Sequence, residues 1–200
     1  MSALLSGVMK RMMMEKLLLA SASPRRAEIL RAVGWSFETL AMDIDETLID
    51  GESAEQAVER LALEKAEAAA KQRPSILVLG ADTTVVVDSE ILGKPQDERD
   101  ARRMLRLLSN RWHDVLTGVA LVRRGSESRR AVAHERTQVR FGQMSDAEID
   151  WYVRSGEPLD KAGAYAVQGC AALFIEEIRG DYWNVVGLPV RLAYKLAGEI

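Results

Sequence analysis

Apolar and polar residues along this chain follow two patterns, one typical of strands and one of helices. Short segments rich in apolar or β-branched residues predict strands at 17–20, 76–80, 83–87, 115–122, 131–141 and 171–178. Apolar residues three and four positions apart predict helices at 23–33, 54–72, 97–108, 145–154 and 189–196. Because strands and helices alternate irregularly, we expect an α/β fold with a mixed β-sheet rather than a strictly doubly wound one.

The length of the chain suits one domain with two lobes. A chain of 200 residues lies in the usual range for a single domain. Residues 1–15 precede the first clear element and show no cleavage pattern of a signal peptide. We therefore expect a dispensable N-terminal arm over 1–15 and a single domain over 16–200.

Composition and charge exclude several classes of protein. Hydrophobic residues make up 48% of the chain and charged residues 28%, which is typical of a globular protein and not of a disordered one. The net charge of −3 provides no basic field, so we expect neither nucleic acid nor a membrane surface as a partner. The single cysteine, Cys170, excludes an internal disulfide, and with two histidines it excludes a Cys/His zinc cluster.

Polar residues follow the first predicted strand, at the point where a helix begins. Ser23 is suited to the helix N-cap and Pro24 to the first helical position. The free N–H groups and the positive dipole end of a helix N-terminus attract anions. Ser21 adds a second hydroxyl, and Arg25 and Arg26 add guanidinium groups, which bind phosphate oxygens through paired hydrogen bonds. These residues predict a phosphate site, and the alternative is an ordinary capped helix with solvated arginines.

An acid and two lysines are candidate catalytic groups. Asp82 follows the apolar run 76–80, and the sites of α/β proteins collect at strand ends. A hairpin centred near Asp88 would make Asp82 and Lys94 cross-strand neighbours, and the alternative is a surface salt bridge of little consequence. Lys65 falls on the apolar stripe of the second predicted helix, so its ammonium either points into a cleft or snorkels at the edge of the stripe.

A run of small residues interrupted by a few polar ones covers 160–169. Small side chains let a backbone approach a ligand closely. Within this run, the amide of Gln168 offers both a donor and an acceptor, so it can pair with the edge of a nucleobase. The alternative is a tight structural loop without a ligand.

The segment 43–48 resembles the D-x-D-x-T-L loop of haloacid-dehalogenase-like phosphatases, in which Asp43 would be the nucleophile. That loop normally follows the first, strongly apolar strand of its fold. Here the weakly apolar segment 39–42 precedes it. We therefore keep this assignment as an alternative only.

Taken in order along the chain, the motifs resemble those of the Maf family. The segments concerned are 19–26, 80–83, 93–95, 108–109, 117–118, 160–165, 180–182 and 187–189. The resemblance implies a Maf/ITPase-like fold, with an elongated mixed β-sheet, flanking helices and two lobes around a central cleft. It also implies a cytoplasmic nucleoside triphosphate pyrophosphatase, which cuts between the α- and β-phosphates and clears unwanted nucleotides from the pool.

The resemblance also implies roles for single residues. The family's functional positions correspond to Ser21, Arg25, Arg26, Glu46, Lys65, Asp82, Lys94 and Gln168. We assign catalysis to Asp82, Lys94, Lys65 and Glu46, and substrate binding to Ser21, Arg25, Arg26 and Gln168, together with Ser23 of the predicted phosphate site. Arg25 and Gln168 resemble the branch of the family that acts on dTTP and UTP, whereas the branch acting on 7-methyl-GTP tends to have Trp and Glu there. Modified pyrimidine nucleotides are further candidate substrates.

The chemistry of a triphosphate agrees with these roles. Phosphoryl transfer depends mainly on positioning and on neutralising about four negative charges. A divalent cation, Mg²⁺ or alternatively Mn²⁺ or Co²⁺, would neutralise these charges together with the side chains of Arg25, Arg26, Lys65 and Lys94. Mg²⁺ is commonly held by one or two carboxylates and by phosphate oxygens, so Asp82 and Glu46 are the candidate metal ligands. Asp82 would also orient or deprotonate the attacking water.

Two other functions stay open at this point. One is a phosphatase that forms a phospho-aspartate at Asp43, and the other is a nucleotide-binding regulator of cell division without turnover. The products formed from a nucleoside triphosphate would separate all three. The sequence does not determine the oligomeric state, and a homodimer is one of the states that it allows.

Overall fold

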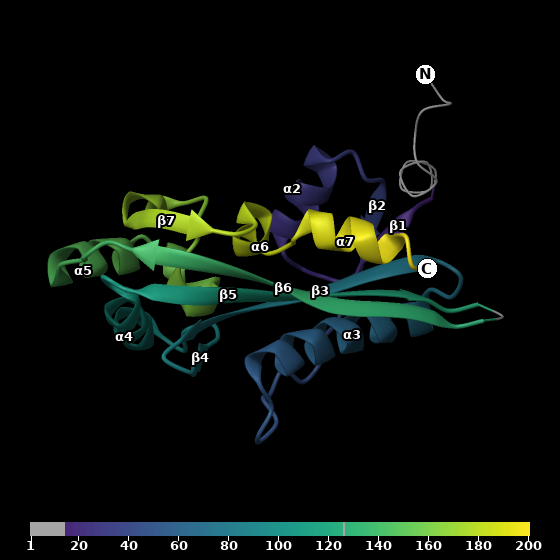
Figure 1. Cartoon of the computed structure of the whole chain (residues 1–200), viewed down its shortest axis with the longest axis horizontal. Helices are drawn as coiled ribbons and strands as arrows, with labels where there is room; N and C mark the ends of the chain where they lie inside the picture. Colours follow the sequence, from purple (N-terminus) through teal and green to yellow (C-terminus); the bar gives the residue numbers. More distant parts are fainter. Residues whose placement is uncertain (1–14, 126) are drawn as a thin grey trace. The chain divides into compact units, whose positions relative to one another are not determined.

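The computed structural model describes residues 15–125 and 127–200, and within them an α/β fold built on a mixed β-sheet (Figure 1). The strands are β1 (Leu17–Leu19), β2 (Phe37–Thr39), β3 (Leu77–Val87), β4 (Glu90–Leu92), β5 (Trp112–Arg123), β6 (Arg129–Phe141) and β7 (Ile175–Arg179). Their order in the sheet is β2-β1-β3-β5-β6-β7, and β4 pairs with β3 outside this path. The predicted fold class, α/β with a mixed sheet, is confirmed.

Helices fill most of the connections between these strands. The α-helices are α2 (Pro24–Ala32), α3 (Ala54–Gln72), α4 (Glu98–Leu108), α5 (Asp146–Arg154), α6 (Tyr182–Val186) and α7 (Val190–Ala197). The short 3₁₀-helices η1 (Glu157–Asp160), η2 (Ala162–Ala164) and η3 (Cys170–Leu173) lie between α5 and β7 in the chain. None of the helices in the described part of the chain is both long enough and apolar enough to cross a membrane.

The predicted elements differ from the structure mainly in short segments. The strands predicted at 76–80 and 83–87 form one strand, β3, because Ala81 and Asp82 between them continue the extended backbone. The strand predicted at 171–178 is wrong in its first half, where the chain forms η3 instead. The prediction lacks β2 and α6, because elements of three and five residues are too short to show a period. The predicted arm, 1–15, lies outside the described residues except for Glu15, which forms an ion pair with Arg123.

The chain divides into two compact units. Unit 1 comprises Met1–Asp82, Thr117–Glu135 and Gly187–Ile200, and unit 2 comprises Thr83–Leu116 and Arg136–Val186. The division falls within β3, β5 and β6, so each of these strands contributes residues to both units.

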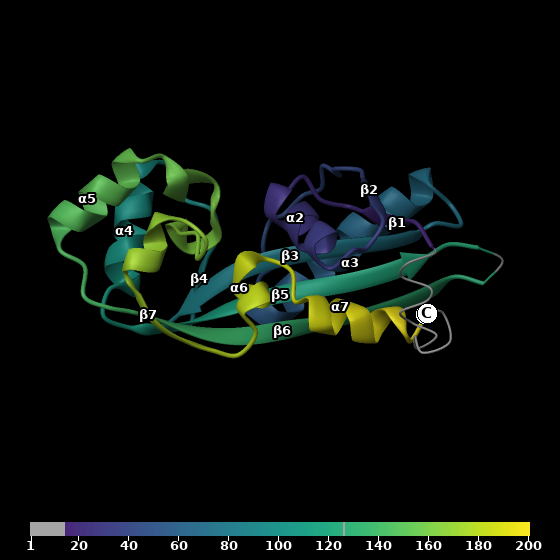
Figure 2. The ribbon, with the colours of Figure 1, turned by 90° about the horizontal axis from the view of Figure 1, so that it is seen from above.

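In unit 1, β1 lies between two parallel neighbours. Leu19 is opposite Thr39 of β2 on one side and Leu79 of β3 on the other. Helix α3 covers one face of the sheet in this unit, and α2 and α7 cover the opposite face (Figure 1 and Figure 2). The core of α3 and the strands consists of small aliphatic side chains, which are Leu18, Ala20, Ala62, Ala66, Ala69, Ala70, Val78, Ala120 and Val122. Because alanine takes little space, α3 can approach the sheet closely.

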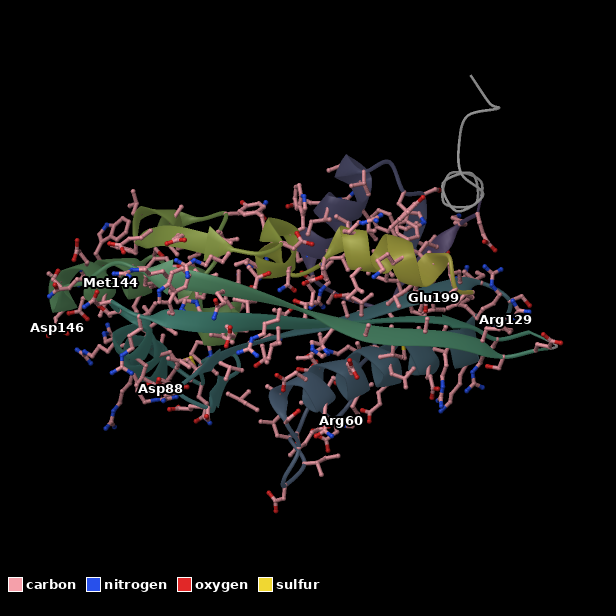
Figure 3. All side chains as sticks on the ribbon, in the orientation of Figure 1. Arg60, Asp88, Arg129, Met144, Asp146 and Glu199 are labelled. Carbon is pink, nitrogen blue, oxygen red and sulfur yellow. The ribbon has the colours of Figure 1, made fainter. Side chains whose placement is uncertain are left out.

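In unit 2, β3 and β4 form a hairpin with Asp88 and Ser89 at its tip (Asp88 is labelled in Figure 3). Both residues have positive φ angles, 47° and 69°, as a two-residue type I′ turn requires. Helices α4 and α5 lie side by side and contact η1 and η2 (Figure 2). The buried aromatic residues Phe141 and Tyr152 belong to the core of this unit.

The register of this hairpin corrects the predicted pairing of Asp82 with Lys94. The ladder pairs Val85 with Leu92 and reaches no further along β4. If the same register continued, Lys94 would lie opposite Thr83. The prediction is therefore wrong by one residue, because the turn has two central residues rather than one.

Candidate active site

Three segments of unit 1 leave the parallel strands at the same edge. The residue after β1 hydrogen-bonds to the backbone of β3, and the residue after β2 hydrogen-bonds to the backbone of β1. Parallel strands place their carboxyl ends at one edge of a sheet, and sites in α/β folds form there. Ser21 at the start of α2, the loop that carries Glu46, and Asp82 in β3 all belong to this edge.

Lys65 of α3 lies between two carboxylates. Its Nζ atom is 2.6 Å from Oδ1 of Asp82 and 2.6 Å from Oε1 of Glu46. The side chains of Lys65 and Asp82 are 10% and 15% exposed, whereas that of Glu46 is 50% exposed. Little water screens the Lys65–Asp82 pair, so this half of the arrangement is the more strongly held. The structure thus brings together three of the predicted catalytic residues, and the lysine points at the acids rather than into solvent.

Two glycines allow this contact by letting α3 lie directly on the sheet. A Cβ atom at Gly80 of β3 would lie 2.2 Å from a backbone carbonyl oxygen of α3, and a Cβ at Gly118 of β5 would lie 2.0 Å from another. Real Cβ atoms do not approach backbone atoms so closely, so both positions require glycine. Alternate residues of a strand point to the same face, so Asp82 faces α3 as Gly80 does. The close approach of helix and strand is therefore what brings Lys65 to Asp82.

Arg26 is a buried cation at the start of α2, with 9% of the residue exposed. Its Nε donates to the carbonyl oxygen of Gly187 at 2.8 Å, and its Nη1 donates to Oγ of Ser21 at 3.1 Å. Burial lowers the pKa of Arg26, while the nearby negative charge of Asp82 acts in the opposite direction. A guanidinium remains protonated in proteins. Arg26 therefore supplies a fixed positive charge close to the acids.

Ser23 occupies the N-cap of α2, as predicted, but its hydroxyl makes no capping hydrogen bond. Its backbone N–H instead donates to Oγ of Ser21 at 3.2 Å. The predicted N-cap position is therefore confirmed, and Ser21 accepts the backbone hydrogen bond at this point. Arg25 is half-buried in the first turn of the same helix. The four residues predicted to bind phosphate thus surround a single helix N-terminus.

Arg60 of α3 anchors the loop that carries Glu46 (Arg60 is labelled in Figure 3). Its Nε and Nη2 atoms donate to the two carboxylate oxygens of Glu52 at 2.7 Å and 2.8 Å. Nη2 also donates to the carbonyl oxygen of Thr47 at 3.1 Å. The hydrogen bonds to Glu52 raise the pKa of Arg60. This fork holds the backbone one residue away from Glu46, and the sequence analysis missed it because no motif marks it.

Two predicted site residues, Lys94 and Gln168, belong to unit 2, and both are exposed. Gly163 N–H donates to the carbonyl oxygen of Gly93 at 3.0 Å. This bond ties the small-residue loop 160–169 to the segment that carries Lys94.

Asp43, the nucleophile of the alternative phosphatase assignment, is exposed in the loop after β2. Two residues on, Asp45 accepts hydrogen bonds from the backbone N–H of Thr47 at 2.9 Å and from its hydroxyl at 2.5 Å. This is an Asx turn, a local structure common in loops. The strand before it, β2, has three residues and none of them is buried, which does not match the apolar strand that the phosphatase loop follows.

The carboxylates of Asp82 and Glu46 are suitable donors for a divalent cation. In residues 15–125 and 127–200, no three or more His, Cys, Asp and Glu side chains are grouped so as to hold a metal ion. Mg²⁺ often takes only one or two carboxylates and completes its shell with water and phosphate oxygens. The two carboxylates therefore match the donor set of a cation that shares the oxygens of a phosphate ligand.

Comparisons with known proteins agree with the motifs. A family model described as "Maf-like protein" matches residues 16–200. A dTTP/UTP pyrophosphatase of Symbiobacterium thermophilum is 55% identical over 177 residues, which cover 88% of this chain and 90% of that protein. A dTTP/UTP pyrophosphatase of Syntrophus aciditrophicus is 51% identical over 179 residues, or 90% of this chain and 87% of that protein.

Solved structures share the fold at low sequence identity. A HAM1 protein from Coxiella burnetii matches with a TM-score of 0.54 and 18% identity, and the match covers 94% of this chain and 100% of that chain. The Staphylococcus aureus Ham1 protein matches with a TM-score of 0.51 and 16% identity, over 93% and 100% of the two chains. At this level of identity the likeness concerns the fold alone.

Proposed function

The chain belongs to the Maf family, and from this premise we propose that it hydrolyses dTTP and UTP to the nucleoside monophosphate and pyrophosphate. One observation carries the proposal: Lys65 is held between Asp82 and Glu46 at the sheet edge where the buried Arg26 lies. Hydrolysis of a phosphoanhydride needs a group that accepts a proton from water and positive charges that stabilise the phosphates. The two relatives named dTTP/UTP pyrophosphatase support the choice of nucleotide.

We assign the phosphates to the start of α2. Arg26 offers a charge already oriented by Ser21 and by a backbone carbonyl, so binding does not have to order it. Arg25 and the hydroxyl of Ser23 add donors in the same turn. Helix N-termini favour phosphate through their free N–H groups.

Asp82 is the group that accepts the proton of the attacking water in this mechanism. The hydrogen bond from Lys65 fixes the orientation of this carboxylate. As the water oxygen bonds to the α-phosphorus, the bond from that phosphorus to the oxygen bridging to the β-phosphate breaks, and the electron pair stays on the leaving pyrophosphate. The protein's cations stabilise that charge.

Asp82 and Glu46 would also hold a divalent cation, Mg²⁺ or alternatively Mn²⁺ or Co²⁺, with Lys65 between them. Such a cation supplies positive charge to the phosphate oxygens. Because Glu46 is half exposed on a loop and Asp82 is on a strand, we expect the loop residue to contribute less to the position of the cation. The two hydrogen bonds from Arg60 of α3 to Glu52 limit the movement of the loop that carries Glu46.

Product analysis tests the reaction. The protein is incubated with each nucleoside triphosphate and Mg²⁺, and the phosphorus products are identified by ³¹P NMR. We expect pyrophosphate and a monophosphate from dTTP and UTP. Release of inorganic phosphate with a nucleoside diphosphate would favour the phosphatase alternative, and binding without turnover would favour the regulator.

For the base, we propose that the amide of Gln168 pairs with the O4 acceptor and the N3–H donor of uracil or thymine. A glutamate can only accept, so it would leave O4 facing a negative charge. An unpaired polar group in a binding site costs about 1–3 kcal/mol, or roughly tenfold to a hundredfold in discrimination.

Gln168→Glu should therefore lower kcat/KM for dTTP and UTP by about that factor, without a matching loss for GTP or 7-methyl-GTP. Gln143→Glu, at an exposed glutamine of the same unit, is the matched control and should leave all four values unchanged. Equal losses for all four nucleotides would mean that Gln168 does not read the base.

The location follows from the substrate in this proposal. Nucleoside triphosphates are made and used in the cytoplasm, so a house-cleaning pyrophosphatase acts there. The net charge of −3 supports small nucleotides, rather than nucleic acid, as its ligands.

A further inference from the structure

The segment of unit 2 that carries Gln168 is a tight turn. Gly169 N–H donates to the carbonyl oxygen of Ala166 at 3.0 Å, which closes a four-residue turn with Val167 and Gln168 at its centre. Val167 is buried and Gln168 is exposed. The turn therefore presents one polar side chain on an otherwise packed segment.

Two side chains from outside the turn hold both of its ends. Ala166 N–H donates to Oη of Tyr152 at 3.2 Å, and Cys170 N–H donates to Oε2 of Glu157 at 3.1 Å. Oη of Tyr152 in turn donates to Oε1 of Glu157 at 2.7 Å. The hydroxyl and the carboxylate thus form one bridge between the two ends of the turn. We call the pair Tyr152–Glu157 the clamp.

The surroundings of the clamp leave it little freedom. Tyr152 of α5 is fully buried, at 0% exposure, and its ring lies 6.1 Å from that of Phe174. Burial raises the pKa of Tyr152, and the hydrogen bond to Glu157 raises it further, so the phenol keeps the proton that it donates. A Cβ atom at Gly169 would lie 2.3 Å from the carboxylate of Glu157. A larger residue at 169 would have to displace this carboxylate, so the turn rests directly on the clamp.

We propose that Tyr152 and Glu157 are positioning residues for base selection, which act by fixing the turn from which Gln168 reads the pyrimidine. The inference rests on the proposed function, because it takes Gln168 as the residue that pairs with the base. A hydrogen bond discriminates between bases only where its direction is set. Loosening the turn should therefore weaken the recognition of pyrimidines more than the phosphate chemistry.

Tyr152→Phe removes only the hydroxyl oxygen and keeps the buried ring. The N–H of Ala166 and one oxygen of Glu157 then lose their partner. We expect kcat/KM for dTTP to fall about tenfold and that for GTP to stay within about twofold. Tyr194→Phe on α7, in unit 1, is the matched control and should leave both values unchanged. Equal falls for dTTP and GTP would overturn the proposal.

The glutamate provides a second pair of variants. Glu157→Ala should act like Tyr152→Phe, whereas Glu157→Gln should retain most of the dTTP preference, because its amide oxygen can still accept from Cys170 N–H while its NH₂ group donates to Oη of Tyr152. Combination with Gln168→Ala separates positioning from a general effect. In that background Tyr152→Phe should change kcat/KM for dTTP by less than about twofold, since coupled residues are not additive. The same tenfold fall in both backgrounds would show that the clamp does not act through Gln168.

Hydrogen exchange gives a readout that does not depend on turnover. In Tyr152→Phe the amides of 166–170 should exchange faster than in wild type, while those of α3 stay unchanged. Unchanged exchange in this segment would overturn the clamp. If the wild-type protein showed no preference for dTTP over GTP, the role proposed for Gln168 would be overturned, but the exchange result would still hold. Failure of the proposed base recognition can therefore be told apart from failure of the clamp.

Discussion

Replacing Gly80 by alanine tests whether the contact between α3 and β3 sets the geometry of the catalytic pair. The new Cβ atom would lie 2.2 Å from the carbonyl oxygen of Ala62, and 2.9 Å and 3.0 Å from atoms of Ala66. An ordinary contact begins at 3.4 Å, so the helix backbone has to withdraw by about 1 Å. Overpacking of this kind costs about 1–3 kcal/mol in the free energy of unfolding.

The same displacement should reduce activity, because Lys65 moves with α3 while Asp82 stays on β3. A shift of about 1 Å in the position of a catalytic group can cost roughly 10²-fold in rate. We therefore expect Gly80→Ala to lower kcat/KM for dTTP by about 10²-fold and to lower the Tm. Steady-state kinetics with dTTP and Mg²⁺, together with thermal unfolding by circular dichroism, measure both effects.

Gly125→Ala is the matched control in the same unit. A Cβ atom there would have Glu127 as its nearest neighbour, at an ordinary distance of 3.8 Å. A glycine replaced without strain stabilises a protein by about 0.4–1 kcal/mol through the unfolded state. Gly125→Ala should therefore retain full activity and a Tm equal to or above that of wild type. If Gly80→Ala behaved in the same way, the close approach of α3 would not control the site.

Three further predictions concern the acids, the Glu46 loop and the response to pH. Asp82→Asn should lower kcat by roughly 10²–10⁴, because an amide cannot accept the proton of water, whereas Asp43→Asn should remain active in the same dTTP assay. Arg60→Lys cannot reproduce the fork that holds the loop, so kcat/KM should fall by up to about tenfold in that assay, with a Tm change that corresponds to no more than about 1 kcal/mol. Burial lowers the pKa of His113 from 6.5 to about 4, so below pH 6.5 the unfolded chain binds a proton that the folded chain does not. The free energy of unfolding should therefore fall by about 3 kcal/mol between pH 6.5 and pH 4. Urea unfolding of His113→Gln should lack this part of the decrease. The same pH profile in the variant and in wild type would contradict the prediction.

The sequence by itself determined the elements whose signals are local. Helix α3 has the predicted bounds, Ala54–Gln72, because an Ala- and Glu-rich run ends just before Pro74. The start of α2 was predictable because serine is preferred at the N-cap and proline at the first helical position. The motifs taken in order, from 19–26 to 187–189, were sufficient to indicate the family.

Only the tertiary structure decided how these residues meet. Lys65 and Asp82 lie on different elements, and their 2.6 Å contact depends on a glycine in the strand and on small residues in the helix. The hairpin register was predicted one residue off, because it depends on positive φ angles at Asp88 and Ser89 that no apolar pattern encodes.

The segment after Gln168 shows the same limit. Its apolar residues predict a strand, yet the chain forms η3, where the N–H of Cys170 bonds to a glutamate carboxylate rather than to a neighbouring strand. Hydrophobic spacing reports which residues of one element share a face, since that depends on local backbone geometry. Which partner satisfies a given backbone or charged group depends on packing between elements far apart in the chain, and only the folded structure determines it.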